Sequence, residues 1–310
     1  MTEQKIFAGN SDRPQDLGET PPPPTARKGL ALAALIFGNV AIAFGPLLVR
    51  YADTGPIASG FWRMALALPF LAYFAHRAGF RASSVPPKIL WLLVFAGTAF
   101  GLDIIAWHIG IFHTKVANAT LFANCASILL VIYGVYLARK LPARTQLIAI
   151  FLAIAGAALL MGQSFELSPR NFLGDWLSLI AGLLYAVYLV LMIRVRASTE
   201  SWGALTLATL VAALVMLPAA FMAGEQILPG NWTPLIILAL SSQVIGQGLL
   251  TYALSHFKPL LIGLALLLQP ALSAAAGWAA FNEALTIYDL FGGILVMAAL
   301  VLVRFSDDVR

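Results

Sequence analysis

Long apolar runs separated by short polar stretches occupy the chain from residue 29 to residue 305. A helix needs ~20 apolar residues to cross the hydrocarbon core of a bilayer. Lipid offers no partner to free backbone groups, so runs of this length are predicted to be helices. The pattern predicts an all-α integral membrane protein with ten transmembrane segments: 29–49, 56–76, 88–112, 115–137, 144–162, 173–193, 202–222, 233–254, 259–281 and 286–305.

One boundary in this pattern is short. Only the polar cluster from His113 to Lys115 separates the third segment from the fourth, and without this boundary the count becomes nine. The 28 residues before the first apolar run are polar and contain four consecutive prolines, which predicts a disordered cytoplasmic tail over residues 1–28. The run after this tail is long enough to span, so we expect it to be retained rather than cleaved as a signal peptide.

Composition excludes several classes of protein. Hydrophobic residues make up 60% of the 310 residues and charged residues 11%, with a mean hydropathy of +0.87, which no ordinary cytosolic enzyme shows. The net charge of +5 is spread between apolar runs instead of forming the clustered basic face that nucleic acid requires. Cys125 is the single cysteine, so neither an intrachain disulfide nor a cysteine-rich metal site can form.

The positions of Lys and Arg predict the orientation, because basic loops stay on the cytoplasmic side. With the N-terminus inside, fifteen of these residues fall in cytoplasmic segments and three, Arg50, Lys115 and Arg170, fall on the opposite side. Arg63 lies within a helix. Both termini are therefore predicted to be cytoplasmic.

An internal repeat is indicated by one offset of 144 residues, which relates Gly38 to Gly182 and Arg50 to Arg194. The repeats, 29–162 and 173–305, would each hold five helices, so the second must enter the membrane inverted. The loop charges agree: Arg139 and Lys140 lie in a cytoplasmic loop, whereas the corresponding region of the second repeat carries Asn282 and Glu283. Inverted repeats are typical of secondary transporters, which bind substrate near the midplane between the repeats.

Two stretches carry a resemblance to a known family. The run from Gly174 to Tyr188, GDWLSLIAGLLYAVY, resembles the opening of the second EamA repeat in the drug/metabolite transporter superfamily. LQPAL at 268–272, followed by NEALT at 282–286 and DLFGG at 289–293, resembles the family's proline, glutamate and glycine pattern. In the first repeat, Arg139-Lys140 stands where a glutamate is frequent and Ala126 replaces the proline that matches Pro270.

The resemblance covers about residues 29–305 and implies a ten-helix carrier, usually an exporter, with a central cavity lined by helices 1, 3, 4, 6, 8 and 9. It also implies a multi-pass protein of the bacterial inner (cytoplasmic) membrane. YddG-like exporters of amino acids belong to this superfamily, as do exporters of drugs and other metabolites and carriers of nucleotide sugars.

Two charged residues lie deep within the predicted segments, where insertion of an ionised group costs about 2.5–3.5 kcal/mol. Arg63 lies about 10 Å and Asp103 about 15 Å from the outer ends of their helices, so the two side chains could meet. One hypothesis makes Arg63 and Asp103 a structural ion pair that clamps their helices together. The other places Asp103 in the cavity, where it titrates during transport, together with His108.

Uncharged polar residues fall at the middle of five predicted helices, and polar groups in hydrocarbon turn inward to find partners. They form a shared polar site or, as the alternative for each of them, hydrogen bonds between helices. Aromatic residues would add apolar walls with polar tips, and Pro270 would loosen its helix as a gate or kink. The candidate cavity residues are Asn39, Asp103, Trp107, His108, Asn124, Tyr185, Tyr188, Gln247, Tyr252 and Gln269.

The chain has no nucleotide-binding loop, no recognisable metal motif and no nucleophile motif, so no cofactor, metal or enzymatic activity is predicted. We expect a secondary carrier that exports amino acids, aromatic or other neutral ones, or related small metabolites. Drug export, transport of a nucleotide sugar, a channel-like protein and a membrane enzyme are the alternatives. The partners are a small-molecule substrate and the lipid bilayer, without nucleic acid, and both a monomer and a homodimer are open.

Overall fold

The computed structural model describes residues 24–114, 119, 122–139, 142–162, 169–269, 271–272 and 287–307. Within these ranges the chain is helical and forms no strand. The first half contains α1 (Pro24–Ala43), α2 (Gly45–Tyr51), α3 (Pro56–Arg77), the 3-10 turn η1 (Ala82–Ser84), α4 (Pro87–His113), α6 (Cys125–Ala138) and α7 (Arg144–Gly162). The second half contains α8 (Phe172–Arg196), α9 (Ser201–Met222), α10 (Thr233–Leu238), the π-helix η2 (Ala239–Gln247), α11 (Gly248–Ala253), α12 (Pro259–Leu266) and α14 (Ile287–Asp307).

Six helical spans in the described part of the chain are long and apolar enough to cross a membrane. The predicted membrane class is therefore confirmed. The count of ten stays a prediction, because the fourth and ninth predicted segments contain residues outside the described ranges. The six spans are Lys28–Val49, Pro56–Arg77, Pro87–His113, Phe172–Arg196, Ser201–Met222 and Thr233–Ala253.

Proline and glycine mark several helix boundaries. Proline occupies the first turn of α3, α4 and α12, where its missing N–H would have no helical partner anyway. Gly79 and Gly224 follow α3 and α9 with φ of 75° and 66°, a conformation that glycine adopts without strain. α1 begins at Pro24, inside the predicted disordered tail of residues 1–28, and residues 1–23 lie outside the described part.

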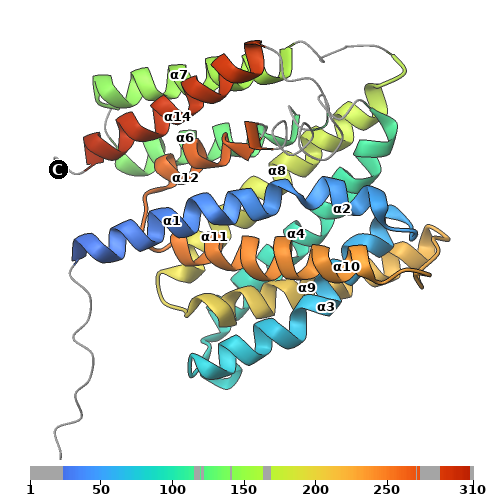
Figure 1. The fold of residues 1–310 in the computed structure, drawn as a ribbon. Coiled ribbons are helices and arrows are strands. Elements are labelled where there is room, and N and C mark those ends of the chain that lie inside the picture. Colours follow the sequence, from blue (N-terminus) through green and yellow to red (C-terminus); the bar gives the residue numbers. More distant parts are fainter. Residues whose placement is uncertain are drawn as a thin grey trace, which may run out of the picture.

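The helices pack as pairs drawn from the two halves of the chain. α4 lies along α8, α3 along α9, α6 along α12 and α7 along α14, while α1 packs against η2 and α11. Figure 1 shows α7 and α14 together at one side of the bundle and α3 and α9 at the other. Small residues allow close approach: a Cβ at Gly97 of α4 would lie 2.5 Å from the Ala208 carbonyl oxygen of α9.

The surface and the interior divide the residue types as a bilayer requires. Large apolar side chains are exposed on the outer helices, such as Phe151 of α7 (72% exposed) and Leu290 of α14 (60%). Polar side chains such as Arg63, Asp103 and Gln243 are buried among the helices. Apolar groups therefore face lipid while polar groups meet one another inside the bundle.

Candidate functional site

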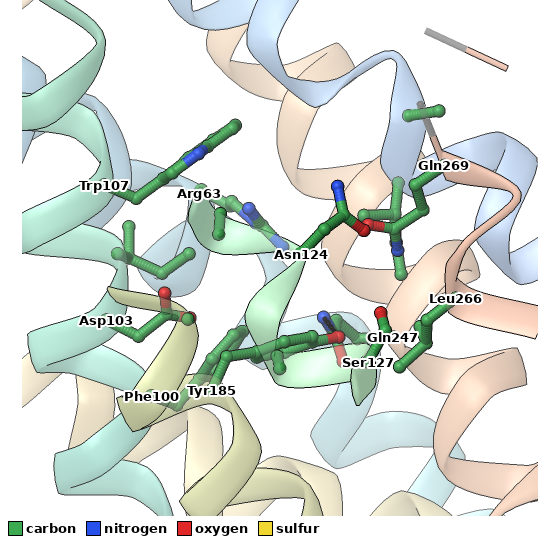
Figure 2. Close-up of a pocket in the computed structure, with 16 residues that line it drawn as sticks. Arg63, Phe100, Asp103, Trp107, Asn124, Ser127, Tyr185, Gln247, Leu266 and Gln269 are labelled. Atoms are coloured by element: carbon green, nitrogen blue, oxygen red, sulfur yellow. Dashed lines mark hydrogen bonds between the residues drawn. The ribbon is translucent and has the colours of Figure 1, made fainter. Parts of the chain in front are cut away.

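A cavity of about 110 Å³ lies between helices of both halves. Its walls come from α1, α3, α4, α6, α8, η2, α12 and the residues next to α6 and α12 (Figure 2). Six of these helices correspond to those that the resemblance implies, and α3 adds Arg63. The lining consists of Ile42, Ala43, Arg63, Phe100, Asp103, Ile104, Trp107, Ala123, Asn124, Ala126, Ser127, Gly182, Tyr185, Gln247, Leu266 and Gln269.

Six of the ten candidate cavity residues line this space, and the other four lie elsewhere. The side chains of α4 enter from one wall, while Gln247 and Gln269 enter from the second half of the chain (Figure 2). The six lining candidates are Asp103, Trp107, Asn124, Tyr185, Gln247 and Gln269.

Arg63 is held from behind by neutral groups. Its Nε donates to Gln243 Oε1 at 3.2 Å, and Gln243 Nε2 in turn donates to Thr209 Oγ1 at 2.9 Å. The guanidinium carbon lies 5.9 Å from the centre of the Phe100 ring, a cation–π distance. Gln243 is fully buried, so α3, α9 and η2 together fix the position of this cation.

The direct ion pair between Arg63 and Asp103, which is one of the two hypotheses, is not formed within the described structure. No nitrogen of Arg63 lies within 4.0 Å of a carboxylate oxygen of Asp103. The physical reason is that Gln243 and the Phe100 ring hold the guanidinium, so both charged residues line the cavity as separate groups (Figure 2).

Gln247 organises the aromatic wall. Its Nε2 donates to Tyr185 Oη at 3.4 Å, and its Oε1 accepts from Tyr188 Oη at 3.5 Å. The Tyr188 ring stacks on Phe100 with ring centres 4.5 Å apart and on Tyr185 with ring centres 5.7 Å apart. Tyr188 is therefore fully buried behind Phe100 and Tyr185 instead of lining the cavity.

Asn39 and Gln269 form a polar link between α1 and the chain that follows α12. Gln269 Nε2 donates to Asn39 Oδ1 at 3.1 Å, and Asn39 Nδ2 donates to the Leu35 carbonyl oxygen at 2.8 Å. Asn39 is fully buried and lies outside the lining, so its role here is to orient the Gln269 amide.

Two further candidates lie apart from the cavity. His108 is fully buried with Nδ1 2.7 Å from the Pro56 carbonyl oxygen and 3.4 Å from Ser59 Oγ, so it connects α4 to the start of α3. The Tyr252 ring packs on His256 with ring centres 4.5 Å apart. Neither residue lines the cavity, and Pro270 lies outside the described residues.

Sequence reasoning missed Gln243, Ser127 and Phe100. Gln243 precedes Gln247 by four residues within the same predicted segment, a spacing that could have identified it. Ser127 and Phe100 carry no sequence signal that separates them from helix packing residues. Among the described residues, no cluster of three or more His, Cys, Asp or Glu side chains could hold a metal ion.

Comparison with known proteins identifies the family. The model of the EamA-like transporter family matches residues 28–162 and again residues 172–305. The chain belongs to the EamA-like transporter family. The resemblance to the drug/metabolite transporter superfamily is thereby confirmed, and the protein is a membrane transporter rather than an enzyme.

Curated relatives of low sequence identity are also named as transporters or exporters. An uncharacterized transporter of Archaeoglobus fulgidus is 24% identical over 279 residues, which cover 88% of this chain and 95% of the relative. The pseudopaline exporter CntI of Pseudomonas aeruginosa is 22% identical over 286 residues, which cover 89% of this chain and 95% of the exporter. A protein of known crystal structure shares the fold with a TM-score of 0.74 at 15% identity, over 91% of this chain and 97% of that one.

Proposed function

We propose that this EamA-like transporter is a secondary carrier that exports amino acids or related small metabolites across the bacterial inner membrane. The observation that carries the proposal is the cavity, whose walls come from both stretches that match the family model. A site between two repeats can face either side of the membrane in turn if the repeats rock around it. The substrate would bind at the midplane, with both chain termini in the cytoplasm.

The packing of the helices supports the inverted arrangement of ten segments in two repeats. An offset of 144 residues maps α4 onto the span of α10, η2 and α11, and it maps α1 and α2 onto α8. The contact between α4 and α8 then becomes the contact of α1 with η2 and α11, which the structure also contains. The pairs α3–α9 and α7–α14 map onto themselves, as a two-fold relation between repeats requires.

The chemistry of the lining supports a small polar substrate with an apolar part. Amide and hydroxyl groups face aromatic rings, and Arg63 is the one base among the lining residues. A nucleotide sugar or a drug with several charges would leave its groups without enough partners here. The name of the Pseudomonas relative, an exporter, supports the outward direction.

Counterflow in proteoliposomes tests the carrier. Vesicles loaded with an unlabelled neutral amino acid are diluted into a trace of the labelled compound, for a panel of substrates that includes other metabolites and drugs. A carrier accumulates label transiently, because its site returns loaded from one side to the other. Accumulation for one or more substrates supports the proposal, and its absence across the panel contradicts it.

A channel would dissipate the label gradient without any transient accumulation. Gly97→Leu is the control for an intact fold, since the larger side chain would strike the Ala208 carbonyl oxygen and separate α4 from α9. If this variant loses counterflow while its vesicles leak label at the same rate as wild-type vesicles, the accumulation of label in the wild type depends on the folded carrier.

A further inference from the structure

The cavity contains two opposite charges that do not neutralise each other. Arg63 is 4% exposed and Asp103 7% exposed, and both line the same space. Each buried ion in a membrane protein is costly unless a partner of opposite charge or a set of hydrogen bonds compensates it. Because no nitrogen of Arg63 lies within 4.0 Å of an Asp103 oxygen, the space between them leaves room for a ligand that compensates both charges.

The Arg63 guanidinium presents its terminal nitrogens to the cavity. Within the described structure its Nε donates a hydrogen bond to Gln243, and its two terminal nitrogens donate none. A guanidinium fork with both terminal nitrogens free matches the two oxygens of a carboxylate. Gln243 and Phe100 hold the fork in place, so little ordering is needed when a ligand binds.

The Asp103 carboxylate has no hydrogen-bond donor in the described part of the chain. Figure 2 shows it on the α4 wall, directed into the space that also receives Arg63 and Asn124. Trp107, one turn further along α4, has its indole Nε1 buried without a partner. A carboxylate in this setting would attract an ammonium group with an apolar neighbour.

We infer that Arg63 and Asp103 are the two specificity-determining charges of the site and that one zwitterionic ligand bridges them. Its carboxylate faces Arg63 and its ammonium faces Asp103. This inference rests on the proposed function and deepens it, because it names the charge pattern of the substrate. Both charges belong to the first half, whereas Tyr185, Gln247 and Gln269 of the second half contribute neutral groups.

Binding of matched compounds to the purified full-length protein tests the inference. Phenylalanine, leucine and methionine are each compared with the corresponding amide, which lacks the carboxylate, and with the corresponding deaminated acid, which lacks the ammonium. Affinities are measured by isothermal titration calorimetry. We expect wild-type protein to bind a zwitterion at least about tenfold more tightly than either singly charged analogue, since each analogue leaves one buried charge without a partner.

Two conservative variants assign the two ends. Arg63→Gln removes the preference for the zwitterion over its amide and keeps the preference over the deaminated acid. Asp103→Asn removes the preference for the zwitterion over the deaminated acid and keeps the preference over the amide. If Arg63 and Asp103 had a purely structural role, each substitution would lower the affinity for all three compounds by the same factor. Asp175→Asn is the control, because Asp175 is also 7% exposed but lies outside the lining.

The inference is overturned if no zwitterion of the panel binds more tightly than its singly charged analogues, or if both variants keep the wild-type order of affinities. Counterflow separates this failure from failure of the proposed function. Counterflow of a singly charged metabolite without counterflow of any zwitterion would support the carrier function and refute the bridging zwitterion. Absence of counterflow across the panel would refute the carrier itself.

Discussion

At the scale of single residues, Gln243 shows how a neutral side chain positions a buried cation. Its amide oxygen accepts from Arg63 and its amide nitrogen donates to Thr209, so both ends of the amide are used. A hydrogen bond to a charged group contributes about 1.5–3 kcal/mol, and loss of one partner leaves the other buried and unsatisfied. The cation in the cavity therefore depends on a residue that does not line it.

Gln243→Leu tests this dependence. The substitution preserves side-chain volume but removes the acceptor for Arg63 Nε, so the guanidinium loses its fixed orientation. We expect substrate affinity in the binding assay to fall about tenfold and the melting temperature of the detergent-purified protein to fall as well. Gln226→Leu, in the exposed α9–α10 loop, serves as the control. An unchanged substrate affinity in Gln243→Leu would contradict the proposal that Gln243 positions Arg63.

At the scale of elements, α3 and α9 obtain the same N-terminal cap from different places. Both are 22 residues long, and in both a glutamate accepts two backbone N–H groups of the first turn. Glu200 caps its own helix α9 at 2.8 Å from Trp202 N and from Gly203 N. Glu225, which follows α9, caps α3 instead, at 3.2 Å from Ile57 N and 2.7 Å from Ala58 N.

Alanine substitutions should separate these two caps. Loss of a cap lowers stability by about 0.5–2 kcal/mol. The first turn of the helix whose N–H groups are freed should open more often. Glu225→Ala should therefore accelerate amide hydrogen exchange at residues 57–60 of α3, and Glu200→Ala should accelerate it at residues 202–205 of α9. Each variant controls for the other. Equal exchange at both sites in both variants would contradict the assignment.

The π-helix η2 also belongs to this scale. It carries Gln243 and Gln247, which contact Arg63 and the two tyrosines of α8. Hydrogen bonds from residue i to residue i+5 widen the helix, and such segments occur frequently at functional sites. Hydrophobic periodicity predicts the span 233–254 as one helix, because the widened turns do not change how apolar the residues are.

At the scale of the whole molecule, the basic residues predict that both termini are cytoplasmic and that the α9–α10 loop lies on the opposite side. Fusions of a fluorescent protein and of alkaline phosphatase test this arrangement in a bacterial host. A C-terminal fluorescent protein should be bright, and phosphatase inserted after Gly230 should be active, because only the exported side allows its disulfides to form. The reverse result at either position would refute the predicted orientation.

Much of the chain's class follows from its sequence alone. Membrane insertion depends on local composition and on the thickness of a bilayer, so the apolar runs predict helices without knowledge of the fold. Family membership likewise follows from local runs such as GDWLSLIAGLLYAVY. Depth within a helix is also local, which is why Asp103, Asn124, Gln247 and Gln269 could be selected as candidates and lie at the cavity.

Only the tertiary structure decided which of these side chains meet. Arg63 and Gln243 are 180 residues apart in sequence, and their contact depends on how α3 packs against η2 and α9. For the same reason His108 faces Pro56 while Asp103, five residues earlier on the same helix, faces the cavity. Composition sets which groups enter the membrane, whereas helix rotation and packing set the partner that each buried polar group finds.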